Sequence, residues 1–490
     1  MCNSPWRSLT ALAAGLAAAA LVSCATDTPT SESTARADTV SPSAGGKVSV
    51  CHQPGPNARI LDIGAPALAD HLSHGDYITT LLVSHDAGLP ADGVHFSRMT
   101  DALGAARAGR IARGELVSAA CRITIAVSVG TYTGTTVSPA ADGLEQFPMV
   151  VDVPDITLRG ALVMGLDSHG RATGDGVGPD ATTLTPAEPL PFVNRISTPI
   201  IIANAHPGGS AGNGLTVEGF VFQSGHDPAV DAGGQAVLSL RTKGLTIRGN
   251  RLEGGFTESI DLRASDADVI QNHLGGTAGT CDICLAGPGT YRATGNRLLA
   301  GGIPGITVDG PVGLPVPDGV EPFVLPATAE TSVELVNNEI SDHNRIATGV
   351  GIRLDAIGPF GPNVQSTVHA TVRDNVLTNN RFGIIVHGAF PQAGTLRRAD
   401  VDATFSGNVI EHSCQAKLLV SFSRHTATLG LTTNPYLQNS TFRLALGGDV
   451  DWNDAWYGHP DGFGNTLIVD GQAIPNGTRQ FYDATGCPGL

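Results

Sequence analysis

Stretches in which apolar and polar residues alternate recur from residue 215 onward, and each of them runs into an asparagine. Alternation with a period of two predicts short β-strands that bury one face. The stretches are LTIRGNRL (245–252), DVIQNHL (268–274), YRATGNRL (291–298), VELVNNEI (333–340), ATVRDNVL (370–377) and ATFSGNVI (403–410). The asparagines are Asn250, Asn272, Asn296, Asn338, Asn375 and Asn408. Their first two intervals are 22 and 24 residues, which is about one coil of a solenoid.

A second series of alternating strands precedes the asparagine strands. Its members are VLSLRT (237–242), SIDLRA (259–264), DICLAG (282–287), GITVDG (305–310), GIRLDA (351–356), GIIVHG (383–388) and KLLVSF (417–422). An asparagine that recurs at one corner can hydrogen-bond its equivalent in the next coil and can tolerate a left-handed backbone. Such a stack requires parallel coils in register, because an antiparallel sandwich would not return the same residue to the same corner. The pattern therefore predicts a parallel β-solenoid.

Together the two series resemble the right-handed parallel β-helix, or pectin lyase-like, superfamily over roughly residues 121–430. Earlier coils are expected at 123–134, 156–161 and 215–220. A helix from Thr100 to about Arg113 would cover the open N-terminal end of the solenoid and prevent edge pairing. We therefore expect an all-β fold, a right-handed parallel β-helix with its N-terminal cap over 96–430 and a C-terminal cap or tail over 431–490.

Composition and charge narrow the function. The chain has 62 glycines and 31 prolines, with only 5% aromatic and 15% charged residues, which is typical of β-rich chains with many corners. The formal net charge of -16 argues against a nucleic-acid partner, because phosphate binding needs a basic surface. An acidic polysaccharide would also be repelled unless Ca²⁺ or a local arginine cluster intervened.

The first residues have the pattern of a targeting segment. Arg7 precedes an apolar run from Leu9 to Val22 that is too short for a stable membrane span. The tetrapeptide LVSC ending at Cys24 resembles a bacterial lipobox, in which the cysteine is lipidated; ordinary signal-peptide cleavage nearby is the alternative. We expect a signal peptide over 1–23 and a disordered tether over 24–47. The predicted protein is exported and held by a lipid anchor alone, on the cell surface or in the periplasm.

Export also permits disulfides. Six further cysteines are candidates, namely Cys51, Cys121, Cys281, Cys284, Cys414 and Cys487. Their even number suits three bridges, but their pairing cannot be derived from spacing. Cys281 and Cys284 form a CxxC, which could serve redox chemistry or half of a zinc site. No second CxxC follows, so a local structural disulfide is the favoured interpretation.

A small module is expected over residues 48–95. Its segments CHQPG (51–55) and HLSHGD (71–76) resemble a short motif, Cys-His-x-Pro followed by His-Leu-x-His-Gly-Asp, seen in many secreted proteins without an assigned role. His52, His71 and His74 are ligand types that suit zinc or copper. The alternative is a disulfide-stapled structural module whose histidines cap turns.

The second strand series predicts where chemistry could lie. In GITVDG, Ile306 and Val308 should face the core, so that Thr307 and Asp309 face solvent. The outward column through Asp309 is then Arg241, Arg263, Ala286, Asp309, Asp355, His387 and Ser421. The neighbouring outward column is Ser239, Asp261, Cys284, Thr307, Arg353, Ile385 and Leu419.

Coils are spaced by about 4.8 Å, so Asp309, Asp355 and His387 are expected in one line with Arg353 beside them. Long connections follow Asp309, Asp355 and His387, all at the same corner of the coil. Loops that leave a rigid scaffold at one corner are expected to wall a cleft. These four residues are therefore the candidate catalytic set.

Three chemistries fit this set. The two aspartates could hold Ca²⁺, or they could act as acid and nucleophile in glycoside cleavage. Alternatively, the set could abstract a proton beside a uronate neutralised by Arg353, leading to β-elimination. The superfamily resemblance implies a polysaccharide partner, but its specific motifs are absent apart from Val386-His387-Gly388, which is similar to part of one hydrolase motif. We predict a polysaccharide-binding lyase or hydrolase; the alternative is a non-catalytic surface scaffold or adhesion protein. The sequence leaves catalysis and oligomeric state open.

Overall fold

The computed structural model describes residues 46–480 with interruptions. The longest are 112–120, 205–212, 227–232, 311–327, 358–364, 389–397 and 423–436. The expected signal peptide, the lipidation residue Cys24, nearly all of the tether and Cys487 lie outside the described residues. Among those described, no helix combines the length and hydrophobicity needed to cross a lipid bilayer.

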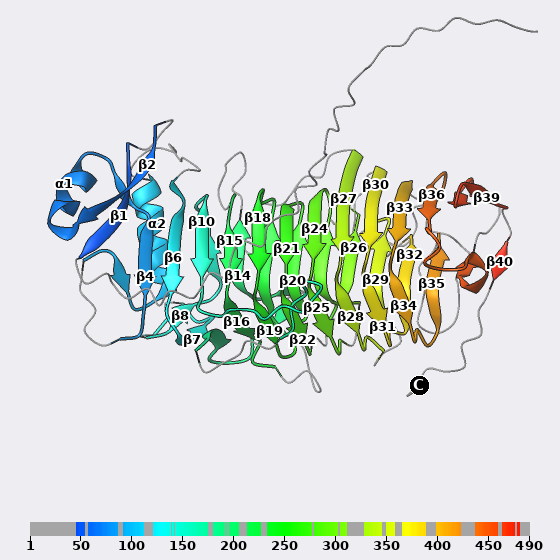
Figure 1. Ribbon diagram of the computed structural model, residues 1–490, viewed down its shortest axis with the longest axis horizontal. Coiled ribbons are helices and arrows are strands. Elements are labelled where there is room, and N and C mark those ends of the chain that lie inside the picture. The colour runs from blue at the N-terminus through cyan, green and yellow to red at the C-terminus, as the bar shows by residue number, and fades with distance from the viewer. Residues whose placement is uncertain are drawn as a thin grey trace, which may run out of the picture. The chain divides into compact units, whose positions relative to one another are not determined.

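Three long sheets, which we call sheets I, II and III, carry the fold (Figure 1). In spatial order the strands of sheet I are β5 (His95–Phe96), β4 (Thr80–Val83), β6 (Ile123–Val127), β10 (Ile156–Arg159), β15 (Thr216–Glu218), β18 (Leu245–Arg248), β21 (Asp266–Ile270), β24 (Gly289–Thr294), β27 (Thr328–Val336), β30 (Gln365–Arg373), β33 (Ala399–Ser406), β36 (Thr441–Ala445), β38 (Thr466–Val469) and β39 (Gln472–Ile474).

Sheets II and III are built in the same way. Sheet II contains β8 (Glu145–Gln146), β7 (Gly130–Thr135), β11 (Thr182–Pro186), β16 (Phe220–Gln223), β19 (Arg251–Glu253), β22 (His273–Gly275), β25 (Arg297–Leu299), β28 (Glu339–Ser341), β31 (Val376–Thr378) and β34 (Val409–Glu411). Sheet III contains β9 (Met149–Val151), β14 (Pro199–Asn204), β17 (Gln235–Leu240), β20 (Glu258–Arg263), β23 (Cys281–Ala286), β26 (Ile306–Asp309), β29 (Val350–Asp355), β32 (Phe382–His387), β35 (Ala416–Ser421), β37 (Trp456–Gly458) and β40 (Arg479–Gln480). A two-stranded hairpin, β12 (Phe192–Val193) with β13 (Ile196–Ser197), stands apart.

Each coil visits the three sheets in turn and pairs in parallel with the coil before it. The strands β18, β19 and β20, for example, pair with β21, β22 and β23 one coil later. Parallel strands joined by crossovers take the right-handed connection almost without exception. The predicted right-handed parallel β-helix is therefore confirmed.

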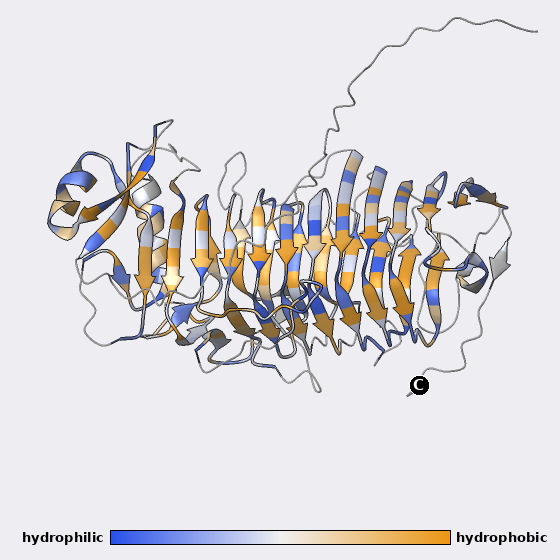
Figure 2. Cartoon of the chain, viewed as in Figure 1, coloured by the Kyte–Doolittle hydropathy of each residue, from blue (hydrophilic) through white to orange (hydrophobic). Residues whose placement is uncertain are grey.

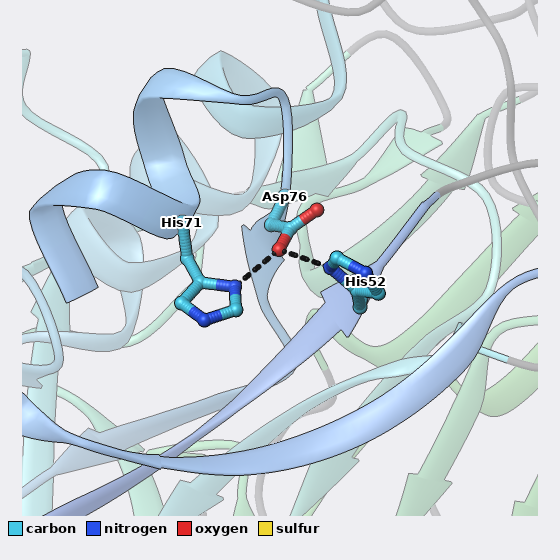
Figure 3. Close-up of side chains that lie close together, drawn as sticks. All are labelled: His52, His71 and Asp76. Carbon is cyan, nitrogen blue, oxygen red and sulfur yellow. Dashed lines mark hydrogen bonds and ion pairs between the residues drawn. The ribbon is translucent and has the colours of Figure 1, made fainter. Parts of the chain in front are cut away.

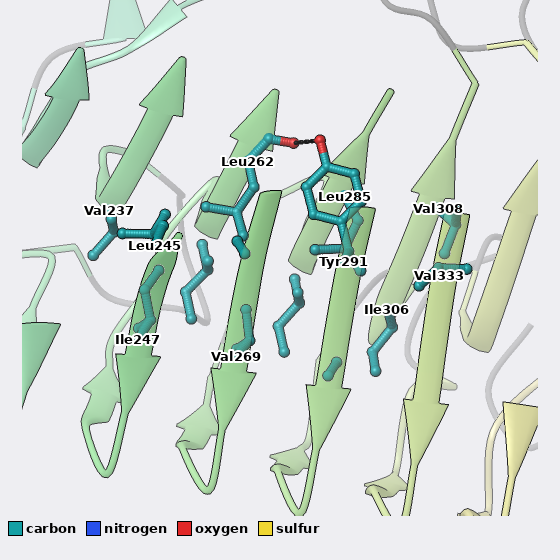
Figure 4. Close-up of a cluster of buried hydrophobic side chains, with 14 of the residues drawn as sticks. Val237, Leu245, Ile247, Leu262, Val269, Leu285, Tyr291, Ile306, Val308 and Val333 are labelled. Atoms are coloured by element: carbon teal, nitrogen blue, oxygen red, sulfur yellow. Dashed lines mark hydrogen bonds between the residues drawn. The ribbon is translucent and has the colours of Figure 1, made fainter. Parts of the chain in front are cut away.

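The core lies inside the coils, where one face of every strand is apolar. Leu245 and Ile247 of β18 are completely buried, as is Val269 of β21 beside them (Figure 4). Apolar and polar residues alternate along the strands of sheet I in Figure 2. Each buried aliphatic side chain contributes about 1.5–3 kcal/mol, so stacking coils is what stabilises a fold with so few aromatic residues.

The six predicted asparagines form a continuous ladder at the corner between sheets I and II. The Nδ2 atom of Asn250 lies 3.1 Å from Oδ1 of Asn272, and the next four steps measure 3.0, 3.0, 2.9 and 2.9 Å. The left-handed backbone, however, belongs to the residue before each asparagine, with φ between 53° and 70°. The predicted location of that conformation was wrong by one residue, because the turn is made first and the asparagine then points inward.

The N-terminal end of the solenoid is covered as predicted. The helix α2 (Met99–Ile111) packs against β4 and β6, and Glu145 accepts hydrogen bonds from the backbone N–H groups of Met99 and Thr100 at its first turn. The preceding module contains an antiparallel sheet of β1 (Lys47–His52), β2 (Arg59–Gly64) and β3 (Tyr77–Ile78), with the 3₁₀ turn Ala65–Ala67 and the helix α1 (Leu68–Ser73). Strand β4 already pairs with β6, so sheet I begins inside the range assigned to the module.

The C-terminal segment continues the sheets beyond residue 430. Strands β36 and β38 extend sheet I, and β37 extends sheet III. Asp449 ends the asparagine ladder, because its Oδ2 accepts from Nδ2 of Asn408 at 2.6 Å. A short 3₁₀ turn (Trp452–Asp454) follows, in which the Trp452 ring stacks on Tyr457.

The structure shows both cysteines of two disulfides. Cys51 is bonded to Cys121, and Cys281 is bonded to Cys284. Cys414 is also disulfide-bonded. The CxxC is thus a local disulfide within β23, as the favoured interpretation held.

Candidate functional site

The four candidate catalytic residues lie together on the outer face of sheet III. Asp309 of β26 is in register with Asp355 of β29, and Asp355 is in register with His387 of β32. Arg353 lies two residues before Asp355 and points to the same side of the strand. The structure therefore places these residues in one row, which we call the sheet III row. Their catalytic role stays a prediction.

Asp355 is the centre of this row. Its Oδ2 lies 3.1 Å from Nε of Arg353, and its Oδ1 lies 2.9 Å from Nε2 of His387. Asp355 is completely buried, and Asp309, Arg353 and His387 are 4–9% exposed. The prediction that Asp309 and Thr307 face solvent was therefore wrong. Side chains about 4.8 Å apart on successive coils cover one another, which an alternation pattern does not reveal.

The two carboxyl groups of the row differ in proton affinity. Burial raises the pKa of Asp309 well above its usual value, and the negative charge of Asp355 raises it further. Burial acts in the same direction on Asp355, but Arg353 and His387 beside it hold the pKa of that carboxyl below its usual range. Asp309 therefore binds a proton more tightly than Asp355 does. Two carboxyls whose pKa values are shifted in opposite directions provide an acid and a base at the same site.

A second charged cluster lies two coils earlier on sheet III. Gln235 donates from Nε2 to Oδ2 of Asp261 at 2.9 Å and also to Glu258, and Arg263 is ion-paired with Asp261. Burial and the charge of Asp261 raise the pKa of Glu258 to about 7. Sequence reasoning missed Gln235 and Glu258 as site residues. They stand at the first positions of their strands, and only their pairing across the coil shows that they meet.

One part of the predicted columns was misaligned. Leu238 pairs with Asp261 and Leu240 pairs with Arg263, so Ser239 and Arg241 do not belong to the outward columns. The Leu-Arg pair shared by the two segments suggested an alignment shifted by one residue. Arg241 instead makes the turn after β17, with φ 58°, as Ala264 does in the next coil with φ 50°.

The predicted loop wall lies in segments outside the described residues. These segments, 311–327, 358–364 and 389–397, follow Asp309, Asp355 and His387.

The predicted calcium site can be compared with the described oxygen donors, since Ca²⁺ takes six to eight oxygen ligands. Asp309 and Asp355 supply carboxylates, but Arg353 contributes a positive charge directly beside them. This donor set suits proton transfer better than calcium.

An open hollow of about 430 Å³ lies on sheet I. His369, Asp402 and Arg443 line it together with Thr371 and Thr404. Its ion pairs are exposed, with 3.6 Å between His369 and Asp402 and 3.1 Å between Arg443 and Asp402. An open hollow with exposed charged side chains suits binding rather than acid–base chemistry.

The structure brings together only part of the predicted metal-ligand set, and metal binding stays a prediction. His52 and His71 converge, but the third side chain beside them is Asp76 rather than His74. His74 is exposed at the end of α1. Cys51 offers no thiolate either, because it is bonded to Cys121.

No protein-family model matches the chain, and no curated protein matches it. Among solved structures, the A-module of a mannuronan C-5 epimerase from Azotobacter vinelandii is 15% identical over 79% of this chain and 95% of its own, with a TM-score of 0.42. An α-1,3-glucanase from Streptomyces thermodiastaticus is 16% identical over 82% and 74%, with a TM-score of 0.33. A tailspike protein of the E. coli bacteriophage HK620 is 11% identical over 88% and 83%, with a TM-score of 0.32. The sheet topology itself identifies this chain as a right-handed parallel β-helix protein.

Proposed function

We propose that the chain binds polysaccharide along the outer face of sheet III and cleaves it by β-elimination at the sheet III row. The supporting observation is the pair of neighbouring carboxyls, Asp309 and Asp355, whose pKa values are moved in opposite directions. A neutral acid beside an ionised carboxylate that holds a histidine is an arrangement for proton transfer.

The spacing of the carboxyls favours β-elimination over glycoside hydrolysis. Asp309 and Asp355 share a hydrogen bond. The acid and nucleophile of a retaining glycosidase are about 5–5.5 Å apart, and the pair of an inverting enzyme is about 6.5–9.5 Å apart. A hydrogen-bonded pair leaves no room for the sugar or water between them. Elimination needs only one base and one acid on the same side of the substrate.

In the proposed reaction, His387 takes the proton next to the carboxylate of a uronate residue, and Asp355 holds the imidazole in place. The electron pair of that C–H bond forms a carbon–carbon double bond as the bond to the glycosidic oxygen breaks. Asp309 donates the proton that this oxygen gains. The products are a shortened chain and an unsaturated sugar, and no water is consumed.

The local charge permits an acidic substrate despite the formal charge of -16. Arg353 and Arg263 are positive, and the raised pKa of Asp309 favours the neutral form of that carboxyl. Glu258, with a pKa of about 7, carries only part of a charge there. The outer face of sheet III is therefore much less negative than the chain as a whole, and it contains the arginines that acidic-polysaccharide binding requires.

The experiment is a degradation assay of the mature chain on uronate-containing and neutral polysaccharides, followed by the ultraviolet absorbance of unsaturated uronate. Asp309→Asn and His387→Gln should each lower the rate by about 10²–10⁴-fold, the usual contribution of a general acid or base. Glu334→Gln is the control, because Glu334 forms an exposed ion pair with Arg373 on sheet I. Absence of unsaturated product from every polysaccharide, or full activity in both variants, would refute the proposal.

Non-catalytic glycan binding is the second candidate, and the open hollow on sheet I favours it. In that case the chain binds polysaccharide without releasing products, and Arg443→Ala weakens binding while Asp309→Asn does not. A binding titration with the same polysaccharides separates the two candidates.

Calcium at Asp309 and Asp355 is tested separately. We expect the melting temperature to be the same in CaCl₂ and in a calcium-selective chelator, because the described donors are too few for this ion. A calcium-dependent rise that Asp309→Asn removes would show instead that the row binds calcium.

Export and lipid anchoring through Cys24 complete the proposal. Cys24→Ser should move the protein from the membrane fraction to the soluble fraction of the producing cells. Membrane attachment that survives this change would exclude the lipid anchor.

A further inference from the structure

Three side chains that are distant in sequence converge in the N-terminal module. His52 ends strand β1, His71 lies in the last turn of α1, and Asp76 directly precedes β3 (Figure 3). The close-up shows both imidazoles directed at the Asp76 carboxylate from different elements. The cluster lies outside the sheet III row, and the proposed function makes no use of it.

The distances within the cluster are short. Nδ1 of His52 lies 2.8 Å from Oδ2 of Asp76, and Nδ1 of His71 lies 2.6 Å from the same oxygen. The other oxygen of Asp76 accepts from the backbone N–H of Gln53 at 3.2 Å. Asp76 is 2% exposed, whereas the two histidine side chains are 23% and 24% exposed. The carboxylate is thus fixed in the interior, and the imidazoles border solvent.

The sequence motif accounts for this convergence. Strands β1 and β3 are antiparallel with Cys51 opposite Tyr77, which places His52 beside Asp76. The backbone N–H of Asp76 donates to the carbonyl of His71 at 3.1 Å, closing the turn after α1. Gly75 in that turn has φ +97°, which other residues rarely adopt. His71, Gly75 and Asp76 of HLSHGD therefore each have a structural reason, whereas the His74 side chain is exposed.

The three groups are suited to bind a cation. The ligand atoms of His52, His71 and Asp76 lie within 4.8 Å of one another. Both imidazoles use Nδ1 toward a single oxygen, so an ion at this point would replace two protons. Zinc bonds of 2.0–2.2 Å in tetrahedral geometry place ligand atoms about 3.3 Å apart. The cluster would open by roughly half an ångström, which partly exposed histidines allow.

We propose that His52, His71 and Asp76 bind one divalent transition-metal ion, with Zn²⁺ as the best match. Two imidazoles and one carboxylate are a common zinc ligand set, and such a set leaves a fourth position for water or another ligand. Cys51 takes no part, because its sulfur is in the disulfide with Cys121. The partly exposed side of the cluster gives the ion a path from solvent.

The test is a calorimetric titration of the full mature chain with Zn²⁺ after removal of metals by a chelator and dialysis. We expect one ion per chain. His71→Gln should lower the affinity by at least about 100-fold, since it removes a direct ligand and even outer partners contribute 10–100-fold. His74→Gln is the matched control, because it changes a histidine of the same motif that does not touch the cluster, and it should bind like the wild type.

Thermal melting separates loss of binding from loss of folding. Zn²⁺ should raise the melting temperature of the wild type and of His74→Gln but not of His71→Gln, as expected for an ion that binds only the folded state. Without metal, His71→Gln should melt close to the wild type. Parallel titrations with Co²⁺ and Cu²⁺ rank the ions, and tighter binding of either at the same residues supports the site. No stoichiometric binding of any of the three, or equal binding by His71→Gln, would overturn the proposal.

Discussion

Two sets of one aspartate, one histidine and one arginine in the described part of the solenoid have opposite surroundings. On sheet III, Asp355 lies 2.9 Å from His387 and 3.1 Å from Arg353, with side chains 0%, 5% and 10% exposed. On sheet I, Asp402 is 3.6 Å from His369 and 3.1 Å from Arg443, and the side chains are 38%, 46% and 54% exposed. The residue types are identical, the Arg–Asp distances are equal, and the Asp–His distance is 0.7 Å longer on sheet I. The largest difference is in burial.

Burial decides what such a set can do. Water and salt screen exposed charges, so the sheet I set gains little from its contacts. In a buried row the same charges interact much more strongly, which is why Asp355 can stay ionised while it raises the pKa of Asp309. A cluster of catalytic residue types on a β-helix is therefore not a site by composition alone. Its desolvation has to be known.

The largest test of this comparison is Asp355→Asn. The change removes the buried negative charge that both Arg353 and His387 contact. Removing one partner of a buried pair costs about 3–5 kcal/mol, so we expect a loss of that size in the free energy of unfolding, measured by urea denaturation. A loss below about 1 kcal/mol, the range of surface pairs, would show that the row is solvated in solution.

The parallel stacking could be predicted from sequence because it is periodic. The asparagines and the line of Asp309, Asp355 and His387 recur once in each coil. Their stacking could therefore be predicted from their spacing along the sequence. The column at Ser239 and Arg241 failed because a shared Leu-Arg pair does not define where a strand ends. Periodicity gives register only where the strand boundaries are also known.

The remainder of both candidate sites depends on tertiary structure. Glu258 contacts Gln235 in the adjacent coil. No local sequence pattern indicates that either residue belongs to a charged cluster. In the module, the sequence favoured His74 as a ligand by its residue type. The turn at Gly75 instead places Asp76 beside His52 and His71. The third residue of the cluster could therefore be identified only once the path of the backbone was known. The alternation of apolar and polar residues likewise could not predict that the sheet III row is buried.

A smaller effect is expected at Glu258, and it depends on pH. The pKa of this carboxyl rises from 4.5 to about 7 on folding, mainly through burial and the neighbouring Asp261. Between these values the folded chain holds more protons than the unfolded chain, so the free energy of unfolding falls as the pH rises. Glu258→Gln cannot ionise and should lose this decline.

At pH 7 the Glu258→Gln variant should be more stable than the wild type by up to about 3 kcal/mol, the free energy that corresponds to the shift. The difference should shrink toward zero below pH 4.5, which gives the experiment an internal reference. Urea denaturation at several pH values measures it. Parallel stability curves for the two chains would mean that Glu258 is solvated and that the second cluster is not buried.

The smallest effect is expected at Asp402→Asn, the counterpart of Asp355→Asn on sheet I. The change removes a carboxylate that faces two partners at ordinary ion-pair distances, so a contact count alone would predict a loss like that at Asp355. Because all three side chains are more than a third exposed, water replaces the lost interactions, and the free energy of unfolding should change by about 0–1 kcal/mol. Salt provides the decisive control. Adding about 1 M NaCl shortens the screening length to roughly 3 Å and should abolish even this difference, while leaving most of the Asp355 effect in place. Equal salt sensitivity at the two positions would mean that burial does not distinguish them.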